Sequence, residues 1–275
     1  MTIGMIGAQN SHAAHFLNAI NSDKLYEGVR AGYIFGGDDP ETCAKLAALH
    51  DLEDCPDEET LIEKSDAVVI TYRKGSMHYK AAMKALHAGK PAFIDKPFTT
   101  DVYEAKKIVD YANENGLLIC GGSNLKGISG IADISGKIEP GDTVVFSYFT
   151  DPASEYDGYF FYGIHTVELC LSIFGLDYKN VSAVNNDGMV VSIVSYPENT
   201  CVIVTSPEFQ TFDVVDVVVH GKKATTHYPL ALDYQNIGSD ELIDMVKTGK
   251  PPRDYSFYET SIKLINEIVQ SAGLQ

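Results

Sequence analysis

The chain has 275 residues, of which 45% are hydrophobic, and a formal net charge of -17 at pH 7. This length and composition predict a globular protein of about two domains with a buried core. An acidic chain repels nucleic acid and anionic lipid headgroups, so neither is an expected partner. The sequence has no apolar run as long as a membrane span, and residues 1–30 lack the apolar core of a signal peptide.

The cysteines are odd in number and include no C-x-x-C pair: Cys43, Cys55, Cys120, Cys170 and Cys201. We interpret them as buried thiols of a reducing compartment, which predicts a cytoplasmic protein. The one close pair of histidines, His12 and His15, has no third ligand nearby in the sequence, so no metal is expected.

The first part of the chain alternates between strand-like and helix-like patterns. Strands are expected at residues 2–8, 29–35, 66–71, 91–95 and 117–122, and helices at 12–20, 40–51, 77–89 and 102–116. Ser11 is expected to cap the first helix, and Asp101 with Glu104 the last. This alternation predicts an α/β fold, a Rossmann-type doubly wound parallel sheet with its ligand crevice at the C-terminal strand ends.

Strand-like runs dominate after residue 122. They are expected at residues 143–149, 181–187, 189–196, 200–206, 213–221 and 223–228, with helices at 166–175 and 256–273. We therefore expect a dinucleotide-binding domain at 1–121 and an α+β substrate and oligomerisation domain at 122–275, built on a mainly antiparallel sheet. One face of such a sheet is left for another subunit, which predicts a homodimer or a higher even homo-oligomer.

The stretch GMIGAQNSHAAH, residues 4–15, stands where a dinucleotide-binding protein has G-x-G-x-x-G. Gly7 is the first glycine, but Gln9 and His12 replace the second and third. Larger residues take space where pyrophosphate approaches and where the helix packs on its strand. The helix start and the side chains of Asn10, Ser11 and His12 still offer donors to a phosphate, so we expect binding that is weaker than usual.

Residues 66–116 resemble the glucose-fructose oxidoreductase and inositol dehydrogenase family, Gfo/Idh/MocA. They contain a buried strand, a helix that ends in ALHAGKP, a strand followed by DKP in place of E-K-P, and an acid-capped helix. GIHTVELCLSIFG, residues 163–175, is similar to the family's D-x-G-x-H-x-x-D. The opening turn fits the family's G-x-G-x-x-G-x-x-H, with His15 as the final histidine. The likeness extends in order over the whole chain.

The resemblance implies an NAD(P)-dependent oxidoreductase that acts on a sugar, a polyol or a related secondary alcohol by hydride transfer. Lys96 and His165 are the implied catalytic pair: Lys96 stabilises the developing alkoxide, and His165 takes the hydroxyl proton. We expect His165 at the start of its helix, where the helix dipole keeps the imidazole neutral.

The resemblance also implies binding residues. The cofactor-binding set is Gly7, Gln9, Asn10, Ser11, His12, Asp38, Thr71, His78, Asp95, Lys96 and Pro97. Gly37 stands where the family has its ribose-binding acid, and Asp38 beside it is the substitute. The cofactor is NAD or NADP, with NAD slightly favoured. The substrate-binding set is Lys126, Tyr162, His165 and Glu168.

Departures from the family pattern keep two other interpretations open. Phe161 stands four residues before His165, where the family has an aspartate, although Asp157 lies nearby in the sequence. With Gln9 and His12, this allows a catalytically degenerate dinucleotide- or sugar-binding regulatory protein. A lyase or epimerase that holds NAD for transient oxidation is the third interpretation. Copurified cofactor and net formation of NADH separate the three.

Overall fold

The computed structural model describes residues 1–209, 214–231 and 236–274, which form two compact units. The first unit comprises residues 1–122 and 235–259, and the second comprises 123–234 and 260–275. The boundary at residue 122 lies next to the expected division. The segment 235–259 differs from the expectation, because it packs with the N-terminal unit.

The first unit contains a six-stranded parallel sheet with the order β3-β2-β1-β4-β5-β6. Its strands are β1 (Thr2–Ile6), β2 (Arg30–Phe35), β3 (Glu53–Asp54), β4 (Ala67–Ile70), β5 (Ala92–Ile94) and β6 (Ile119–Gly121). The predicted doubly wound sheet is confirmed, and β3 is a short addition to it.

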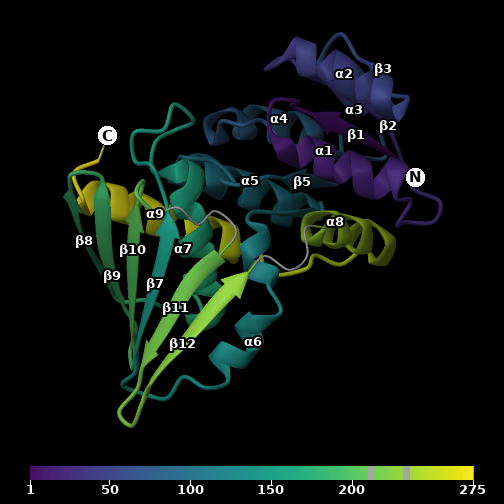
Figure 1. Ribbon diagram of the computed structural model, residues 1–275. Coiled ribbons are helices and arrows are strands. Elements are labelled where there is room, and N and C mark those ends of the chain that lie inside the picture. The colour runs from purple at the N-terminus through teal and green to yellow at the C-terminus, as the bar shows by residue number, and fades with distance from the viewer. Residues whose placement is uncertain (210–213, 232–235, 275) are drawn as a thin grey trace. The chain divides into compact units, whose positions relative to one another are not determined.

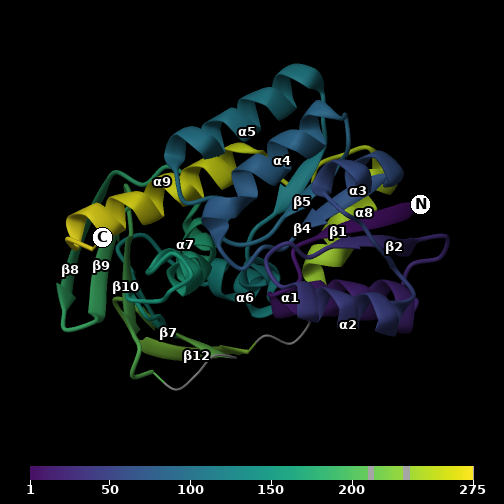
Figure 2. The same ribbon diagram turned by 90° about the horizontal axis from the view of Figure 1, so that it is seen from above.

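Helices cover both faces of this sheet. They are α1 (Ser11–Leu17), continued by a π-helical turn at Asn18–Ser22, α2 (Pro40–His50), α3 (Glu58–Lys64), α4 (His78–His87), α5 (Val102–Asn115) and α8 (Ile237–Thr248). Side chains of α1, α2 and α8 share one hydrophobic core with β1, β2 and β5, including Phe16, Phe93 and Leu242. Helices α4 and α5 lie on the opposite face (Figure 2).

Helix α8 was not predicted from the sequence. Gly238 in its first turn is a weak helix former, although Asp240 near the start, Lys247 in the last turn and Gly249 after it are ordinary helix signals. Gly238 packs closely against β5: a Cβ at this position would lie 2.9 Å from the Phe93 ring, so only glycine allows this approach. Tyr26 also donates a hydrogen bond of 2.7 Å to Asp240 Oδ1. Through these contacts, helix α8 packs within the first unit.

The second unit contains a six-stranded sheet with the order β12-β11-β7-β10-β9-β8 (Figure 1). Its strands are β7 (Thr143–Phe149), β8 (Asn180–Asn186), β9 (Met189–Ser195), β10 (Thr200–Ser206), β11 (Val214–His220) and β12 (Thr225–Ala231). Among the described strands of this second sheet only the β7–β10 pair is parallel, so the predicted mainly antiparallel sheet is confirmed. Residue 213, expected to begin β11, lies outside the described residues.

Helices α6 (Gly130–Ser135), α7 (Phe160–Phe174) and the C-terminal part of α9 (Ser256–Ser271) belong to this unit. The strands alternate regularly between buried and more exposed side chains. The buried side chains include Val144, Phe146 and Ile203. The other face carries apolar residues as well, among them Val184 and Ile193, which are 63% and 42% exposed.

The five cysteines are all free and buried, as expected. Among the residues that the structure describes, no helix combines the length and the apolar character that crossing a bilayer requires.

We predict that the exposed apolar face of the second sheet forms a homo-oligomer interface. Ile193 pairs with Val202 across β9 and β10, so Ile193→Lys would place a charge within this face, and burying that charge in an interface is costly. We expect light scattering to show an even oligomer for the native chain and a shift towards monomer for Ile193→Lys. Leu49→Lys, at an exposed leucine of α2, is the matched control. A native chain that stays monomeric at high concentration contradicts the prediction.

Candidate active site

Four expected cofactor-binding positions follow neighbouring strands of the parallel sheet. Gly7 follows β1, Asp38 lies beyond β2, Thr71 follows β4, and Asp95 follows β5. These strands are adjacent in the order β2-β1-β4-β5, and their C-terminal ends share one edge of the sheet. The first unit therefore has polar groups at the edge where doubly wound sheets bind their ligands.

Gly7 occupies a position that only glycine fits. Its φ is +95°, and a Cβ there would lie 2.6 Å from Tyr72 N and 2.8 Å from Thr71 C. The Gly7 amide donates to Phe35 O at 2.8 Å, and Thr71 Oγ1 donates to Gly7 O at 3.1 Å. The turn after β1 is thus held by the ends of both neighbouring strands.

Asp38 is bound to the same turn. Its two carboxylate oxygens accept the backbone amides of Ala8 at 2.9 Å and Gln9 at 3.2 Å. Each oxygen has a further lone pair, so the carboxylate retains acceptor capacity. The expected substitute for the ribose-binding acid therefore lies against the glycine turn.

Asn10, and not Ser11, caps helix α1, which corrects the sequence-based expectation. The Asn10 side-chain oxygen accepts the His12 amide at 3.1 Å, while its Nδ2 donates to Asp95 Oδ2 at 2.8 Å. Ser11 is the first helical residue and is exposed. Asn10 is favoured as the cap because its Nδ2 atom also donates a hydrogen bond to the buried Asp95 carboxylate.

Asp95 is buried and lies in contact with His12. The Nδ1 atom of His12 is 2.9 Å from both carboxylate oxygens of Asp95. Burial alone would raise the pKa of Asp95, but the charge and hydrogen bond of His12, together with the Lys96 charge, lower it to about 2. Asp95 is therefore an ionised group within the protein. The imidazole of His15 lies beside His12, with ring centroids 5.8 Å apart.

Lys96 follows Asp95 at the end of β5 and is only 3% exposed. Burial lowers the pKa of its ammonium to about 8, with a contribution from the Arg73 charge, while the Asp95 charge opposes this shift. A lysine with such a pKa exchanges its proton near neutral pH, as proton-transfer groups do.

His78 lies at the start of α4, as expected, and is fully buried. Its Nδ1 atom lies 2.7 Å from Pro97 O and its Nε2 atom 2.8 Å from Tyr72 O. Burial lowers the pKa of His78, and the Asp95 charge opposes the shift. Because both ring nitrogens face backbone carbonyls, His78 links the segment after β4 to the segment after β5.

The second unit contains a different cluster, centred on Ser123. Its Oγ atom lies 2.6 Å from His165 Nδ1, and its backbone amide donates to Glu168 Oε2 at 2.8 Å. Lys126 Nζ donates to Ser123 O at 3.1 Å. All four residues are buried. Three of the four predicted substrate-binding residues are thus gathered around Ser123.

His165 lies in the second turn of α7, which corrects the expected place at the helix start. The helix begins at Phe160, because the aromatic residues that precede His165 continue the helical packing. The Phe161 ring packs 5.1 Å from Tyr156 and 4.7 Å from Tyr162. Tyr162, the fourth predicted substrate-binding residue, also lies 5.8 Å from the His165 ring and is half-buried.

Ser123 was not singled out from the sequence. A serine after a glycine pair is common in turns, and two of its partners, His165 and Glu168, lie more than forty positions along the chain. The available signal was its place directly after Gly121 and Gly122, at the end of the last parallel strand. Within the described residues, no group of three histidine, cysteine or acidic side chains could hold a metal ion.

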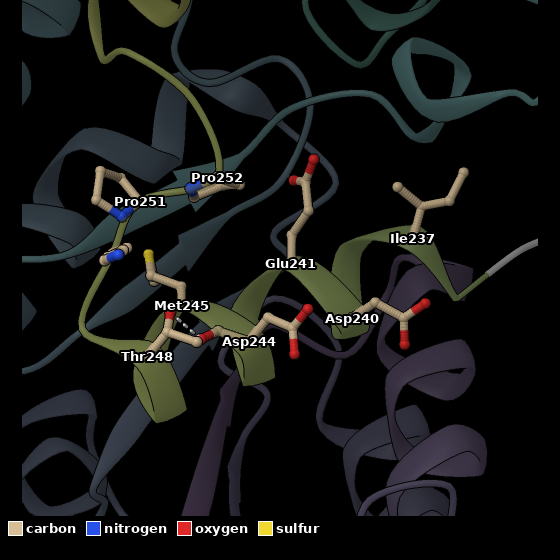
Figure 3. Close-up of a pocket in the computed structure, with 9 residues that line it drawn as sticks. Ile237, Asp240, Glu241, Asp244, Met245, Thr248, Pro251 and Pro252 are labelled. Carbon is tan, nitrogen blue, oxygen red and sulfur yellow. Dashed lines mark hydrogen bonds between the residues drawn. The ribbon is translucent and has the colours of Figure 1, made fainter.

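A pocket of about 360 Å³ lies along α8 in the first unit and contains none of the predicted site residues. Asp240, Glu241 and Asp244 line it, and Figure 3 shows Glu241 on a different side of the helix from the two aspartates. The three carboxylates therefore do not converge on one point. A second pocket, of about 680 Å³ and including His50, also lacks the predicted site residues.

Residues 1–122 match the model of the Gfo/Idh/MocA family, described as an oxidoreductase family with an NAD-binding Rossmann fold. An uncharacterized oxidoreductase of Escherichia coli K12, YhhX, is 27% identical over 188 residues. That match covers 61% of this chain and 54% of YhhX, so it spans about half the length of this curated relative.

Solved structures of the same fold cover nearly the whole chain. GenD2 from gentamicin A biosynthesis, solved with NAD, has a TM-score of 0.84 at 13% identity, over 99% of this chain and 94% of that one. UDP-N-acetylglucosamine 3-dehydrogenase GnnA from Acidithiobacillus ferrooxidans has a TM-score of 0.79 at 17% identity, over 100% and 99%. At these identities the likeness is one of fold.

We predict that Gly7→Ala destabilises the protein far more than Gly89→Ala. Both glycines have positive φ, +95° and +70°, but a Cβ at Gly89 meets nothing within 4 Å, whereas one at Gly7 meets backbone. We expect Gly89→Ala to lower the free energy of unfolding by about 1 kcal/mol, from backbone strain alone. Gly7→Ala should lower it by roughly 3 kcal/mol or more, because the Cβ also meets backbone atoms. Urea unfolding of both variants measures the difference. Equal losses would show that the contact with Tyr72 and Thr71 is not limiting.

Proposed function

Because the chain belongs, through residues 1–122, to the Gfo/Idh/MocA oxidoreductase family, we propose that it is an NAD(P)-dependent oxidoreductase of sugars, polyols or related secondary alcohols. The observation that carries this proposal is Lys96. It is a buried ammonium at the C-terminal edge of the sheet, with a pKa of about 8 and an ionised carboxylate, Asp95, next to it.

Two proteins of the same fold support the proposed cofactor and substrate class. GenD2 is described in complex with NAD, and GnnA as a dehydrogenase of UDP-N-acetylglucosamine. A hydroxyl on a sugar or cyclitol ring is therefore the group that we propose this chain oxidises.

The residues of the first unit suit a dinucleotide. Gly7 makes the tight turn that the motif requires, and Asp38 presents a carboxylate with spare acceptor capacity to ribose hydroxyls. Gln9, Asn10, Ser11, His12 and Thr71 are proposed to complete the site around this turn. His78, Asp95 and Pro97 would support the cofactor site through Lys96 and the segment after β5.

In the proposed mechanism, a bound nicotinamide supplies the hydride acceptor. Lys96 Nζ donates a hydrogen bond to the substrate oxygen and stabilises the negative charge that develops there. His165 takes the hydroxyl proton as general base. We further propose that Tyr162, Lys126 and Glu168 shape the substrate site around His165, with the two charged residues acting through Ser123.

The proposal includes a cytoplasmic location and a homodimer or a higher even oligomer. The five free, buried cysteines support the first, because thiols of this kind persist in a reducing compartment. The apolar outer face of the second sheet supports the second.

We predict that NADH binds about tenfold more tightly than NADPH, a difference of about 1.4 kcal/mol in binding free energy. The Asp38 carboxylate is fixed by two backbone amides, and a ribose 2′-phosphate beside it would meet like charge. Asp38→Ser removes the negative charge and should bring the affinities for NADH and NADPH closer together. Calorimetry with NAD, NADH, NADP and NADPH measures this, and the absence of heat with all four at millimolar concentration would contradict cofactor binding itself.

We predict that Lys96→Ala and His165→Ala each lower kcat by roughly 10²-fold or more, the scale of a positioned acid or base, with far smaller effects on cofactor affinity. Turnover should also fall as pH rises through about 8, because Lys96 then loses its charge. Steady-state kinetics on a panel of sugars and polyols provide the test.

Lys90→Ala and His220→Ala are matched controls for these two variants. Lys90 precedes β5 at its opposite end, where its Nζ donates to Ser65 O at 2.6 Å, and His220 is an exposed residue of β11. Full turnover in both Lys96→Ala and His165→Ala would rule out the proposed mechanism. Tight cofactor binding without turnover on any alcohol would favour the regulatory interpretation.

A further inference from the structure

Arg73 and Lys74 lie in a short loop after β4 and have no role in the proposed function so far. The two residues before them, Thr71 and Tyr72, are buried, whereas Arg73 is half-buried and Lys74 is exposed. The loop ends at a 3₁₀ turn, Gly75–Met77. It therefore continues from the C-terminal end of an inner strand, at the edge where doubly wound sheets bind their ligands.

This loop is held against the segment that follows β5. The ring of His78 lies 2.8 Å from Tyr72 O through Nε2 and 2.7 Å from Pro97 O through Nδ1. At the other end of the loop, a Cβ at Gly75 would overlap the Pro97 ring, so these two residues are in close contact. The contacts lie on both sides of Arg73 and fix its backbone beside the segment after β5.

Two cations share this edge of the sheet. Burial lowers the pKa of Lys96 to about 8, the Asp95 charge opposes that shift, and the Arg73 charge adds to it. The Asp95 carboxylate already lies within hydrogen-bonding distance of Asn10 and His12. Two positive charges and one negative charge thus leave a net positive charge among these three groups.

A second cation beside a buried ammonium is unfavourable, because like charges repel most strongly where water is excluded. Composition does not explain the pair, since the chain has 38 acidic residues and only 21 lysines and arginines. Unfavourable charge arrangements of this kind are typical of functional sites. An anion bound at this edge would be attracted by both cations and would relieve their repulsion.

We infer that the substrate is a sugar or polyol that carries an oxyanion, a carboxylate or a phosphate group, and that Arg73 binds this group. The inference rests on the proposed function, in which Lys96 contacts the oxygen that is oxidised. It deepens that function by naming the charge of the substrate and the residue that recognises it. A guanidinium presents its N–H groups in a planar fork that matches both kinds of oxyanion.

The strand order separates Arg73 from the phosphates of the proposed cofactor. The strands lie in the order β2-β1-β4-β5. In the proposed site, a ribose binds at Asp38 beyond β2, and the pyrophosphate binds at the turn of Gly7 after β1. Arg73 follows β4 and lies towards Lys96, where the substrate is oxidised. An oxyanion held by Arg73 therefore belongs to the substrate.

The kinetic test compares neutral and anionic forms of the same sugar: D-glucose, D-glucuronate and D-glucose 6-phosphate, and the same three forms of D-galactose. At pH 7 most of Lys96 is protonated. We expect the native kcat/KM to be about tenfold or more higher for an anionic form than for the neutral sugar, the scale of a hydrogen-bonded charge pair. Arg73→Gln should remove this preference, chiefly through KM, and change the neutral sugar by less than about threefold. The uronate and the phosphate ester show which oxyanion is preferred.

Lys74→Gln is the matched control, because Lys74 is the next residue of the same loop and is exposed. It should keep the native preference. Arg73→Lys keeps the charge without the planar fork, so it should lose less than Arg73→Gln. Removing the Arg73 charge should also raise the pKa of Lys96. The fall in turnover near pH 8 should therefore move to higher pH in Arg73→Gln and stay in place in Lys74→Gln.

Calorimetry tests recognition without turnover, because NADH and an alcohol do not react with each other. With NADH present, we expect an anionic sugar to bind the native protein and Lys74→Gln alike, and Arg73→Gln about tenfold more weakly or less. Such binding without formation of NADH from NAD would reject the proposed function alone. Equal use of neutral and anionic sugars would overturn the inference and leave the proposed function standing. Weaker NADH binding in Arg73→Gln with an unchanged substrate KM, or no binding of any anionic sugar, would also overturn the inference.

Discussion

The contact between His12 and Asp95 is the interaction on which the chemistry of the first unit depends. Asp95 is buried at the end of β5, and a buried carboxylate stays ionised only where donors surround it. His12 and Asn10 supply those donors from the turn and helix that follow β1. The ionised Asp95 in turn offsets the burial of Lys96. Without His12, Asp95 would keep only the Asn10 donor and the Lys96 charge, and its ionised form would be less stable beside the proposed hydride-transfer site.

This contact changes how the altered glycine motif is understood. His12 replaces the third glycine of G-x-G-x-x-G, which taken alone suggests a damaged phosphate-binding turn. The structure gives the histidine a specific partner at 2.9 Å, so the substitution adds an interaction between strand ends. Gly7 keeps its place because backbone from the segment after β4 would block any Cβ. The turn thus retains the glycine that geometry demands and uses the third position for electrostatics.

The sequence predicted the strands and long helices well, because apolar periodicity and caps such as Asp101, which accepts the Glu104 amide, are local signals. It missed α8, in which Gly238 lies so close to the Phe93 ring that a Cβ would be 2.9 Å from it. It also assigned the α1 cap to Ser11, because the competing bond from Asn10 to Asp95 spans 85 positions. Ser123 was missed for the same reason: its partner His165 is 42 residues away. Local patterns predict elements, whereas long-range hydrogen bonds decide which polar residue matters.

The two units meet different electrostatic requirements with different groups. Lys96 must remain cationic while buried, so it needs a negative neighbour, and the ionised Asp95 provides one. A general base must instead be neutral before the reaction, and a carboxylate bonded to its ring would favour the protonated form. Ser123 fixes the His165 ring through a neutral hydroxyl at 2.6 Å. The side chains of Glu168 and Lys126 are hydrogen-bonded to the amide and the carbonyl of Ser123, so they stabilise the position of the hydroxyl. Phe161 stands where the family has an aspartate, so the group bonded to His165 Nδ1 in this chain carries no negative charge.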